Sequence, residues 1–235
     1  MKICGQKKKI CGQKRQMGKD KLRRFAENET FDNMFQMKYE DVKDGFYLKG
    51  KWREEFFKND NPLVLELGCG KGEYTVGLAK QYPNKNFIGI DIKGARMWRG
   101  CKTSVDEKIN NVAFVRTHVQ LLNFYFGEKE VSEIWITFPD PQLKKPNKRL
   151  TSPRFLDNYA KVLRDDAVIH LKTDSQELYD YTLNEVLIPQ NRKVLISTNN
   201  LYESNIIEDV ISIRTFYENI YLKEGKPITY LKFQL

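Results

Sequence analysis

The chain has 235 residues, of which 40% are hydrophobic and 30% are charged, and it carries a formal net charge of +9. This composition is typical of a folded globular protein with room for one large core, and it excludes an intrinsically disordered chain. No apolar run reaches the roughly 20 residues that a membrane-spanning helix needs, so we expect no membrane partner.

The positive charge is concentrated at the N-terminus. Residues 1–16 hold six basic side chains and no acidic one, so the other 219 residues hold 34 basic and 31 acidic side chains, a net charge of +3. This segment contains a near repeat, KICGQK from Lys2 and again from Lys9. We predict that residues 1–16 are a basic extension, disordered or non-native, and that Met17 is the natural start; the alternative is a basic arm that touches RNA.

Targeting and metal binding leave no signal in the sequence. The basic N-terminus is not followed by the apolar stretch of a secretory signal, so we expect a cytoplasmic protein. The four cysteines form no CxxC pair and the two histidines are far apart, so we expect neither a metal site nor a disulfide framework.

The first elements surround a glycine-rich stretch. Residues 17–61 form a lead-in with patches of basic and aromatic side chains, and residues 52–57 are predicted to be a short helix. The main domain is predicted over residues 62–235. It opens with a buried strand from Leu63, a turn through Gly68, Gly70 and Gly72, and a helix.

Strand and helix signals then alternate to the end of the chain. A four-residue apolar spacing predicts a helix over 97–105, and Ser152 before Pro153 predicts the start of another. The apolar stripe of that helix is Phe155, Leu156, Tyr159, Val162 and Leu163. Asp174 with Glu177 resembles a capping box for a third helix. The further strands are predicted over 87–92, 112–115, 134–138, 168–172, 194–197 and 228–233.

This alternation predicts an α/β fold: a Rossmann-like, doubly wound, mostly parallel sheet of seven strands with helices on both faces. Ligands of such sheets bind beyond the carboxyl ends of the strands. The residues that follow each strand are therefore the candidates for a site.

The first candidate is the glycine loop. Its pattern is ExGxGxG from Glu66, and a dinucleotide-binding GxGxxG would need a glycine at position 73, where this chain has Glu73. Gly68 and Gly70 let the backbone approach a ligand closely. The motif resembles that of S-adenosylmethionine-dependent methyltransferases, so a nicotinamide-dependent oxidoreductase is the weakest alternative.

The second and third strand ends extend this cofactor site. Asp91 ends the second strand, nineteen residues after Gly72, near the spacing at which a carboxylate accepts from ribose hydroxyls. The third strand leads to His118 and Val119. Many methyltransferases have an acid there for the adenine amino group, and this chain has Val119, so we expect a backbone contact instead. We interpret His118 as structural.

The fourth strand ends in Phe138-Pro139-Asp140-Pro141. The two prolines restrict the backbone on either side of Asp140, which is therefore held at the mouth of the site. A basic cluster without an acid follows directly, with Lys144, Lys145, Lys148 and Arg149. Although such a run is commonly a solvated face, its position beside Asp140 favours contacts to RNA phosphates.

From about Met17 onward the chain resembles the bacterial tRNA (guanine-N7-)-methyltransferase family. The matching segments are ELGCGKG from Glu66, FIGIDI from Phe87, FPDP from Phe138 with its basic tail, HLKTD ending at Asp174, and residues 215–218. The resemblance implies that Glu66, Asp91, Asp140 and the backbone near Val119 bind S-adenosylmethionine, and that Asp140 occupies the catalytic position.

The same resemblance implies a tRNA substrate. Its contacts would come from Lys144 and Asp174 and from the stretch Thr215, Phe216, Tyr217 and Glu218. The chain departs from the family in having Gln142 where Trp is frequent, in a shorter basic segment, and in having aromatic rather than basic residues after Thr215. We expect a monomer or a homodimer.

The chemistry of the implied reaction sets what Asp140 must do. Guanine N7 is an unprotonated lone pair, so its methylation needs no general base, and the ring gains positive charge as the methyl group moves. We therefore predict that Asp140 acts by placement and electrostatics. The alternatives are a methyltransferase for another RNA, a protein or a small molecule, and a non-catalytic RNA-binding protein on this fold.

Overall fold

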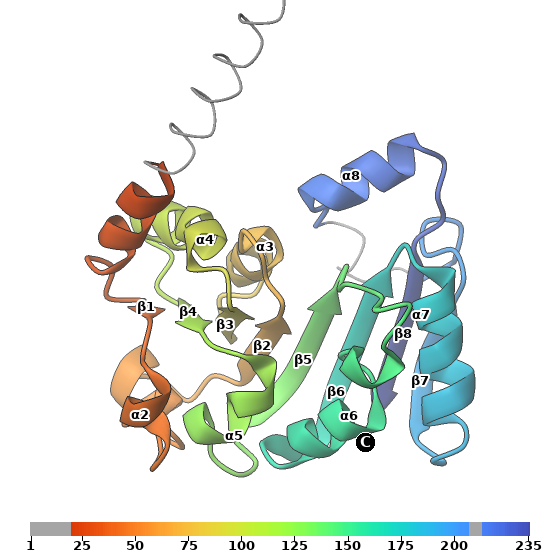
Figure 1. Ribbon diagram of the computed structural model, residues 1–235, viewed down its shortest axis with the longest axis horizontal. Helices are drawn as coiled ribbons and strands as arrows, with labels where there is room; N and C mark the ends of the chain where they lie inside the picture. Colours follow the sequence, from red (N-terminus) through yellow and green to blue (C-terminus); the bar gives the residue numbers. More distant parts are fainter. Residues whose placement is uncertain (1–19, 207–212) are drawn as a thin grey trace, which may run out of the picture.

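A computed structural model describes residues 20–206 and 213–235 (Figure 1). The extension predicted for residues 1–16 and the start predicted at Met17 lie outside the described residues. One sheet runs through the molecule in the order β1-β4-β3-β2-β5-β6-β8-β7. Its strands are β1 (Met34–Phe35), β2 (Leu63–Leu67), β3 (Asn86–Asp91), β4 (Val112–Arg116), β5 (Val131–Thr137), β6 (Leu163–Thr173), β7 (Lys193–Thr198) and β8 (Thr229–Gln234).

The predicted class of sheet is confirmed, with one correction to its size. Strands β1 to β6 pair in parallel, and β8 pairs antiparallel with both β6 and β7. All seven predicted strands are present, but β1 makes an eighth. It is two residues long and pairs with Phe114 and Val115 of β4. Because this pairing joins residues far apart in the sequence, no local pattern predicts the strand. The lead-in therefore belongs to the same sheet as the main domain.

Helices cover both faces of this sheet (Figure 1). Those of the lead-in are the helical residues 20–28, α2 (Tyr39–Val42) and η1 (Trp52–Phe57). The others are α3 (Glu73–Gln81), α4 (Gly94–Asp106), η2 (Val119–Leu121), α5 (Leu122–Tyr125), η3 (Pro146–Lys148), α6 (Pro153–Ala160), α7 (Gln176–Asp180), η4 (Tyr181–Leu187) and α8 (Phe216–Lys223). None of the described helices combines the length and the apolarity needed to cross a bilayer.

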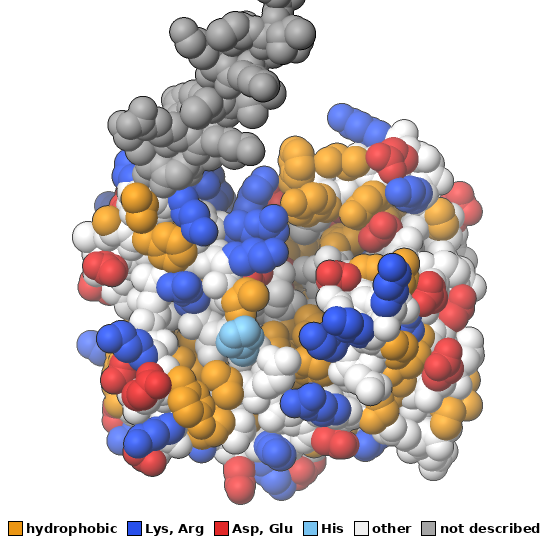
Figure 2. All heavy atoms as spheres, in the orientation of Figure 1, with side chains coloured by type: hydrophobic (Ala, Val, Ile, Leu, Met, Phe, Trp, Pro, Cys, Tyr) orange, Lys and Arg blue, Asp and Glu red, His pale blue; other side chains and the backbone are white. Residues whose placement is uncertain are grey.

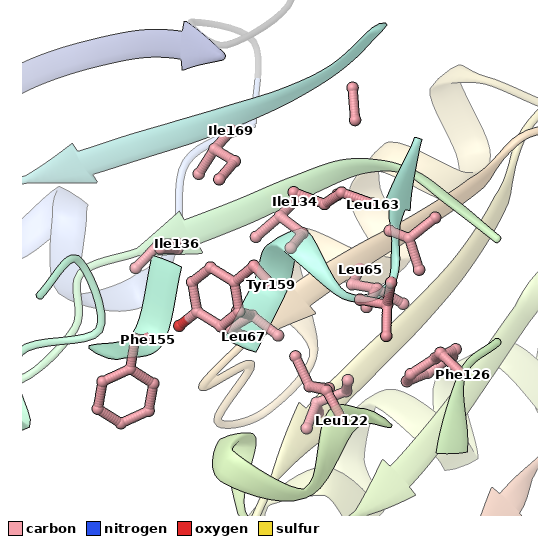
Figure 3. Packing of buried hydrophobic residues seen from close by; sticks show 14 of the residues in the cluster. Leu65, Leu67, Leu122, Phe126, Ile134, Ile136, Phe155, Tyr159, Leu163 and Ile169 are labelled. Carbon is pink, nitrogen blue, oxygen red and sulfur yellow. The ribbon is translucent and has the colours of Figure 1, made fainter. Parts of the chain in front are cut away.

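Two hydrophobic cores flank the sheet because side chains alternate along each strand. Leu65 of β2 and Ile134 of β5 face the core that Leu122 and Tyr159 complete from α5 and α6 (Figure 3). Val64, one residue before Leu65, belongs instead to the core beneath α3 and α4. Burial on both faces of the sheet explains why its central strands are continuous apolar runs.

Two local predictions were wrong by a few residues. Helix α6 ends at Ala160, and Leu163 of its predicted stripe instead begins β6 opposite Val131. The apolar pattern continues past the end of α6 because β6, the next element, is buried in the same core. Helix α7 is capped by Ser175, whose hydroxyl accepts from the amide of Leu178, and not by Asp174.

Gly72 provides a test of how α3 and α4 pack. Its φ is +71°, and a Cβ there would lie 2.6 Å from a ring carbon of Phe114 and 3.2 Å from Cα of Gly100. We expect Gly72→Ala to lower the free energy of unfolding by about 3 kcal/mol, from backbone strain together with overpacking. Urea denaturation measures this loss.

The matched control is Gly50→Ala. Gly50 has a similar φ of +77°, but nothing lies within 4 Å of the place where a Cβ on it would stand. It should therefore lose only about 1 kcal/mol, the cost of the backbone conformation. An equal loss in the two variants would contradict the role assigned to Gly72.

Candidate functional site

The glycine loop is tied to β3 by backbone hydrogen bonds. The amides of Gly68 and Cys69 both donate to the carbonyl of Ile90, at 2.7 and 3.0 Å. Gly68 and Gly70 have φ of +77° and +56°, a region that favours glycine. Burial raises the pKa of the Cys69 thiol well above its usual value, so this cysteine stays protonated.

Asp91 connects the same loop to the end of β3. One carboxylate oxygen accepts from the amide of Gly70 at 2.9 Å, and the other accepts from the amide of Lys93 at 2.8 Å. The side chain is half-buried. Each carboxylate oxygen can accept a second hydrogen bond, so Asp91 is fixed in position and still able to accept from ribose hydroxyls.

Glu66 lies beneath the loop and is buried. One carboxylate oxygen accepts from the amide and the hydroxyl of Thr75, and the other accepts from the hydroxyl of Thr137 at 2.6 Å. Burial raises the pKa of Glu66 from 4.5 to about 7, although these hydrogen bonds oppose the shift. Glu66 thus joins β2 to α3 and β5, and its oxygens are already engaged inside the protein.

A cavity of about 360 Å³ opens above these residues, and we call it the glycine-loop cavity. Its volume lies within the range of small-molecule sites. The predicted residues that line it are Glu66, Gly68, Gly70, Asp91, Thr215 and Tyr217; the others are Arg24, Cys69, Lys71, Glu73, Tyr74, Arg96, Thr137 and Phe138. Four motifs that are distant in the sequence therefore meet at one site, together with Arg24 of the lead-in.

The C-terminal segment forms one wall of this cavity. Thr215 caps α8, where its hydroxyl accepts from the amide of Glu218. The amide of Phe216 donates to the carboxylate of Glu73 at 3.1 Å, and the ammonium of Lys71 lies 4.4 Å from the Phe216 ring. These contacts hold the segment against the start of α3.

Glu218 does not face the cavity, contrary to its predicted substrate contact. Its side chain is 0% exposed. It pairs with the ammonium of Lys172 at 2.7 Å, and it accepts from the hydroxyl of Tyr202 at 2.5 Å. Because a group buried in this way cannot reach a nucleobase, Glu218 positions Thr215 and α8.

Asp140 lies in an exposed turn at the end of β5. One of its carboxylate oxygens accepts from the amide of Gln142 at 3.0 Å. Phe138 and Gln142 both have positive φ, 47° and 46°, so the turn combines two left-handed residues with two prolines. Phe138 lines the glycine-loop cavity, which places Asp140 two residues from its wall.

Arg149 stands apart from the lysines of its cluster. Lys144, Lys145 and Lys148 are exposed, whereas Arg149 is only 3% exposed. Its guanidinium donates to the carbonyl of Pro141 at 2.9 Å and pairs with Glu177 at 2.5 Å. The predicted phosphate contact of Arg149 does not fit this burial, because its side chain instead clamps the Asp140 turn onto α7.

Asp174 and Val119 are two further predicted residues outside the lining of the glycine-loop cavity. Asp174 is half-buried after β6, and burial raises its pKa. Val119 opens η2, where its carbonyl accepts from the side-chain amide of Asn158 at 3.2 Å. The predicted backbone contact near Val119 would therefore have to share that carbonyl. His118 is exposed, so the structural role predicted for it has no buried contact to support it.

A second cavity, of about 430 Å³, is lined by Ile92, the residue after Asp91, and we call it the β4-end cavity. Its lining combines strand ends with the lead-in: Phe25, Glu29, Gln36, Met37, Lys38, Tyr39, Ile92, Arg116, Thr117, His118, Leu121 and Tyr125. Figure 2 shows a hollow on this face of the molecule, with Lys and Arg side chains gathered on both sides of it.

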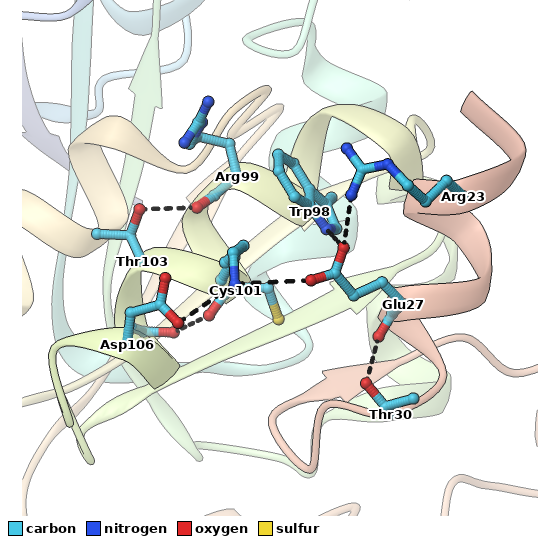
Figure 4. A network of polar contacts seen from close by, with 10 residues as sticks. Arg23, Glu27, Thr30, Trp98, Arg99, Cys101, Thr103 and Asp106 are labelled. Carbon is cyan, nitrogen blue, oxygen red and sulfur yellow. Dashed lines mark hydrogen bonds and ion pairs between the residues drawn. The ribbon is translucent and has the colours of Figure 1, made fainter. Parts of the chain in front are cut away.

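The lead-in also contributes Arg24 to the glycine-loop cavity, which the sequence motifs did not indicate. The helical residues 20–28 dock on α4 through Glu27, which accepts from the indole of Trp98 at 2.8 Å and from Arg23 at 3.1 Å (Figure 4). The guanidinium of Arg24 lies 4.9 Å from the same indole ring. The basic and aromatic patches of this segment were the only signal available.

Comparisons with known proteins show which family the chain resembles. A family model described as "Putative methyltransferase" matches residues 60–231. A tRNA (guanine-N(7)-)-methyltransferase of Christiangramia forsetii is 54% identical over 221 residues, which cover 92% of this chain and 98% of that protein. One of Bacteroides fragilis is 50% identical over 221 residues, covering 93% and 87%.

Solved structures agree at the level of the fold alone. The crystal structure of the 16S rRNA methyltransferase KamB superposes with a TM-score of 0.60 at 17% identity, covering 77% of this chain and 91% of that chain. A structure described as an antibiotic-related methyltransferase has a TM-score of 0.59 at 17% identity, covering 83% and 98%.

The raised pKa of Glu66 predicts a pH dependence of stability. A carboxyl whose pKa rises from 4.5 to about 7 on folding stabilises the fold fully below pH 4.5, and this contribution is lost as the pH rises through 7. Glu66→Gln removes that titration. The unfolding free energy of the wild type, relative to the variant, should fall by about 3 kcal/mol between pH 4.5 and 8 in urea denaturation. A difference that does not change with pH would contradict the assignment.

Proposed function

Because the chain belongs to the tRNA (guanine-N7-)-methyltransferase family, we propose that it transfers the methyl group of S-adenosylmethionine to N7 of a guanine in tRNA. The observation that carries this proposal is 54% identity along nearly the whole length of a relative with that name. The meeting of the glycine loop, Asp91 and residues 215–217 at one cavity supports it. A tRNA substrate implies a cytoplasmic location.

A single experiment tests the reaction. The purified chain is incubated with labelled S-adenosylmethionine and unmodified tRNA, and the product is mapped by strand cleavage selective for N7-methylguanine. We expect one labelled guanine, in the variable loop by resemblance to the family. Label at another ring position, or none, would overturn the proposal.

The residues of the site fit S-adenosylmethionine. When bound, this cofactor supplies an electrophilic methyl group on a sulfonium. Gly68 and Gly70 present backbone without side chains to the cavity, and a Cβ at either would find no atom closer than 4.0 Å. Asp91 would accept from the ribose hydroxyls, and Glu66 would act from below by holding the loop in place.

The target guanine would enter beside Thr215 and Tyr217, and Tyr217 offers an aromatic face that is 44% exposed. Asp140 would stabilise the positive charge that the ring gains, without removing a proton. Asp174 has a carboxylate that could accept from the N1 and N2 edge of guanine. The base must leave its stack or come from a flexible loop to reach this position.

The tRNA backbone would cross the exposed lysines beside the Asp140 turn. Lys144, Lys145 and Lys148 are exposed on one short segment around η3, which Arg149 anchors from within. Lysines in this arrangement neutralise phosphates without reading sequence. They would orient the tRNA, while the cavity would select the base.

Replacing Asp140 separates charge from local structure. Asp140→Asn keeps an oxygen that can accept from the amide of Gln142 but removes the negative charge. We expect kcat for tRNA methylation to fall on the order of 100-fold in this variant, and further in Asp140→Ala. The affinity for S-adenosylmethionine, measured by calorimetry, should stay within about tenfold in both. Unchanged turnover in Asp140→Asn would remove its charge from the mechanism.

Replacing Lys144, Lys145 and Lys148 together by Ala should weaken tRNA binding. We expect the slope of log K against log salt concentration to become shallower by about 2 to 3, since each lost phosphate contact removes about 1. Fluorescence anisotropy at several salt concentrations measures the slope. The control replaces Lys43, Lys49 and Lys58, exposed lysines between α2 and β2. Equal slopes for the two triple variants would exclude the predicted lysine surface.

A further inference from the structure

The short strand β1 brings a lead-in residue to the ligand edge of the sheet. Met34 and Phe35 pair in parallel with Phe114 and Val115, so Gln36 follows β1 at the same edge where Arg116 ends β4. Ligands bind at this edge in sheets of this kind. Gln36 lines the β4-end cavity together with Ile92 and His118.

Gln36 carries a buried acceptor that lacks a donor. Among the described residues, no hydrogen-bond donor reaches its side-chain oxygen Oε1. That oxygen lies 2.9 Å from where a Cβ on Gly94 would stand, so it is held beside the turn that follows Asp91. An unpaired buried oxygen of this kind destabilises a folded protein, and it requires an explanation.

The chemistry of adenine matches this acceptor. The exocyclic N6 amino group of adenine donates hydrogen bonds, which an unpaired buried acceptor such as Oε1 of Gln36 can accept. We propose that the adenine of S-adenosylmethionine binds in the β4-end cavity and donates from N6 to Oε1 of Gln36. This inference rests on the proposed function, because it assumes that cofactor.

The position of the two cavities fits one extended ligand. Asp91 lines the glycine-loop cavity and Ile92, the next residue, lines the β4-end cavity, so a ribose at Asp91 leaves its base on the Ile92 side. Ile92 is 47% exposed, an apolar side chain against which a purine ring can pack. Since the terminal torsion of glutamine is broad, the amide of Gln36 can turn its oxygen into the cavity without a backbone shift.

Other polar groups of the cavity are weaker candidates. The hydroxyl of Thr117 makes a hydrogen bond with Tyr125, and Arg116 is a donor whose Nε lies 3.3 Å from the carbonyl of Ile92. Glu29 remains as a second acceptor, but its side chain is exposed to solvent at the end of the helical residues 20–28. An exposed carboxylate gains less from a hydrogen bond to adenine than a buried unpaired oxygen does.

The test measures whether binding depends on the N6 amino group of the purine. Calorimetry gives the affinities of S-adenosylhomocysteine and of S-inosylhomocysteine, in which an oxygen acceptor replaces the N6 donor, for the full chain. We expect the wild type to bind the adenosyl compound about 10- to 100-fold more tightly. Gln36→Leu should weaken adenosyl binding about tenfold and bring the two affinities within about threefold.

Three further variants complete the design. Gln36→Glu keeps the acceptor and should keep the preference for the adenosyl compound. Glu29→Leu tests the competing acceptor. Gln190→Leu controls for the substitution itself, because Gln190 is exposed and lines neither cavity. Neither should change the ratio of the two affinities. Circular dichroism confirms that each variant is folded.

The outcomes separate this inference from the proposed function. The inference is overturned if the wild type does not discriminate, if Gln36→Leu keeps the wild-type ratio or weakens both ligands equally, or if Glu29→Leu alone removes the preference. If the wild type binds neither compound, the cofactor assignment itself fails. If the adenosyl compound binds well and only the Gln36 prediction fails, the proposed function stands.

Discussion

The buried carboxylate of Glu66 is the contact on which the site depends. Near the end of β2 it accepts from Thr75 at the start of α3 and from Thr137 at the end of β5, so one side chain joins three elements beneath the glycine loop. The loop is held on its other side by Asp91, which accepts from the amide of Gly70. Because the glycine loop is constrained on both sides, it is ordered before a ligand binds, and less conformational entropy is lost on binding.

Charged residues around the Asp140 turn and α8 fall into two groups, one buried and one exposed. Arg149 is buried and holds the Asp140 turn through the carbonyl of Pro141, while Lys144 of the same cluster is exposed. Glu218 is buried with Lys172 and holds the segment from which Tyr217 reaches the cavity. Charged residues of one motif thus have two roles. The buried ones fix the backbone geometry, and the exposed ones are accessible to a ligand.

Burial also explains which features of the structure could be predicted from the sequence. Apolar runs identified the central strands because a strand buried on both faces is apolar throughout, and the ends of these strands indicated Asp91 and Asp140 as candidates. The sequence did not reveal β1, whose two residues form a strand by pairing with β4 some eighty positions later. Nor could a motif distinguish Arg149 from Lys148, because burial arises from tertiary contacts that spacing along the chain does not encode.

Docking of the C-terminal segment completes the cavity, and a buried ion pair makes that docking cooperative. The ammonium of Lys172 on β6 and the carboxylate of Glu218 on α8 are both 0% exposed, and burial lowers the pKa of Lys172 although Glu218 opposes this shift. If α8 left, this ion pair would break, and the loss of one partner of a buried ion pair costs about 3–5 kcal/mol. Because Thr215 and Tyr217 line the cavity together with Gly68 and Gly70, a ligand that contacts both segments binds only the docked state. Such a ligand must therefore stabilise the C-terminal segment as well as the loop, by the free energy of its own binding.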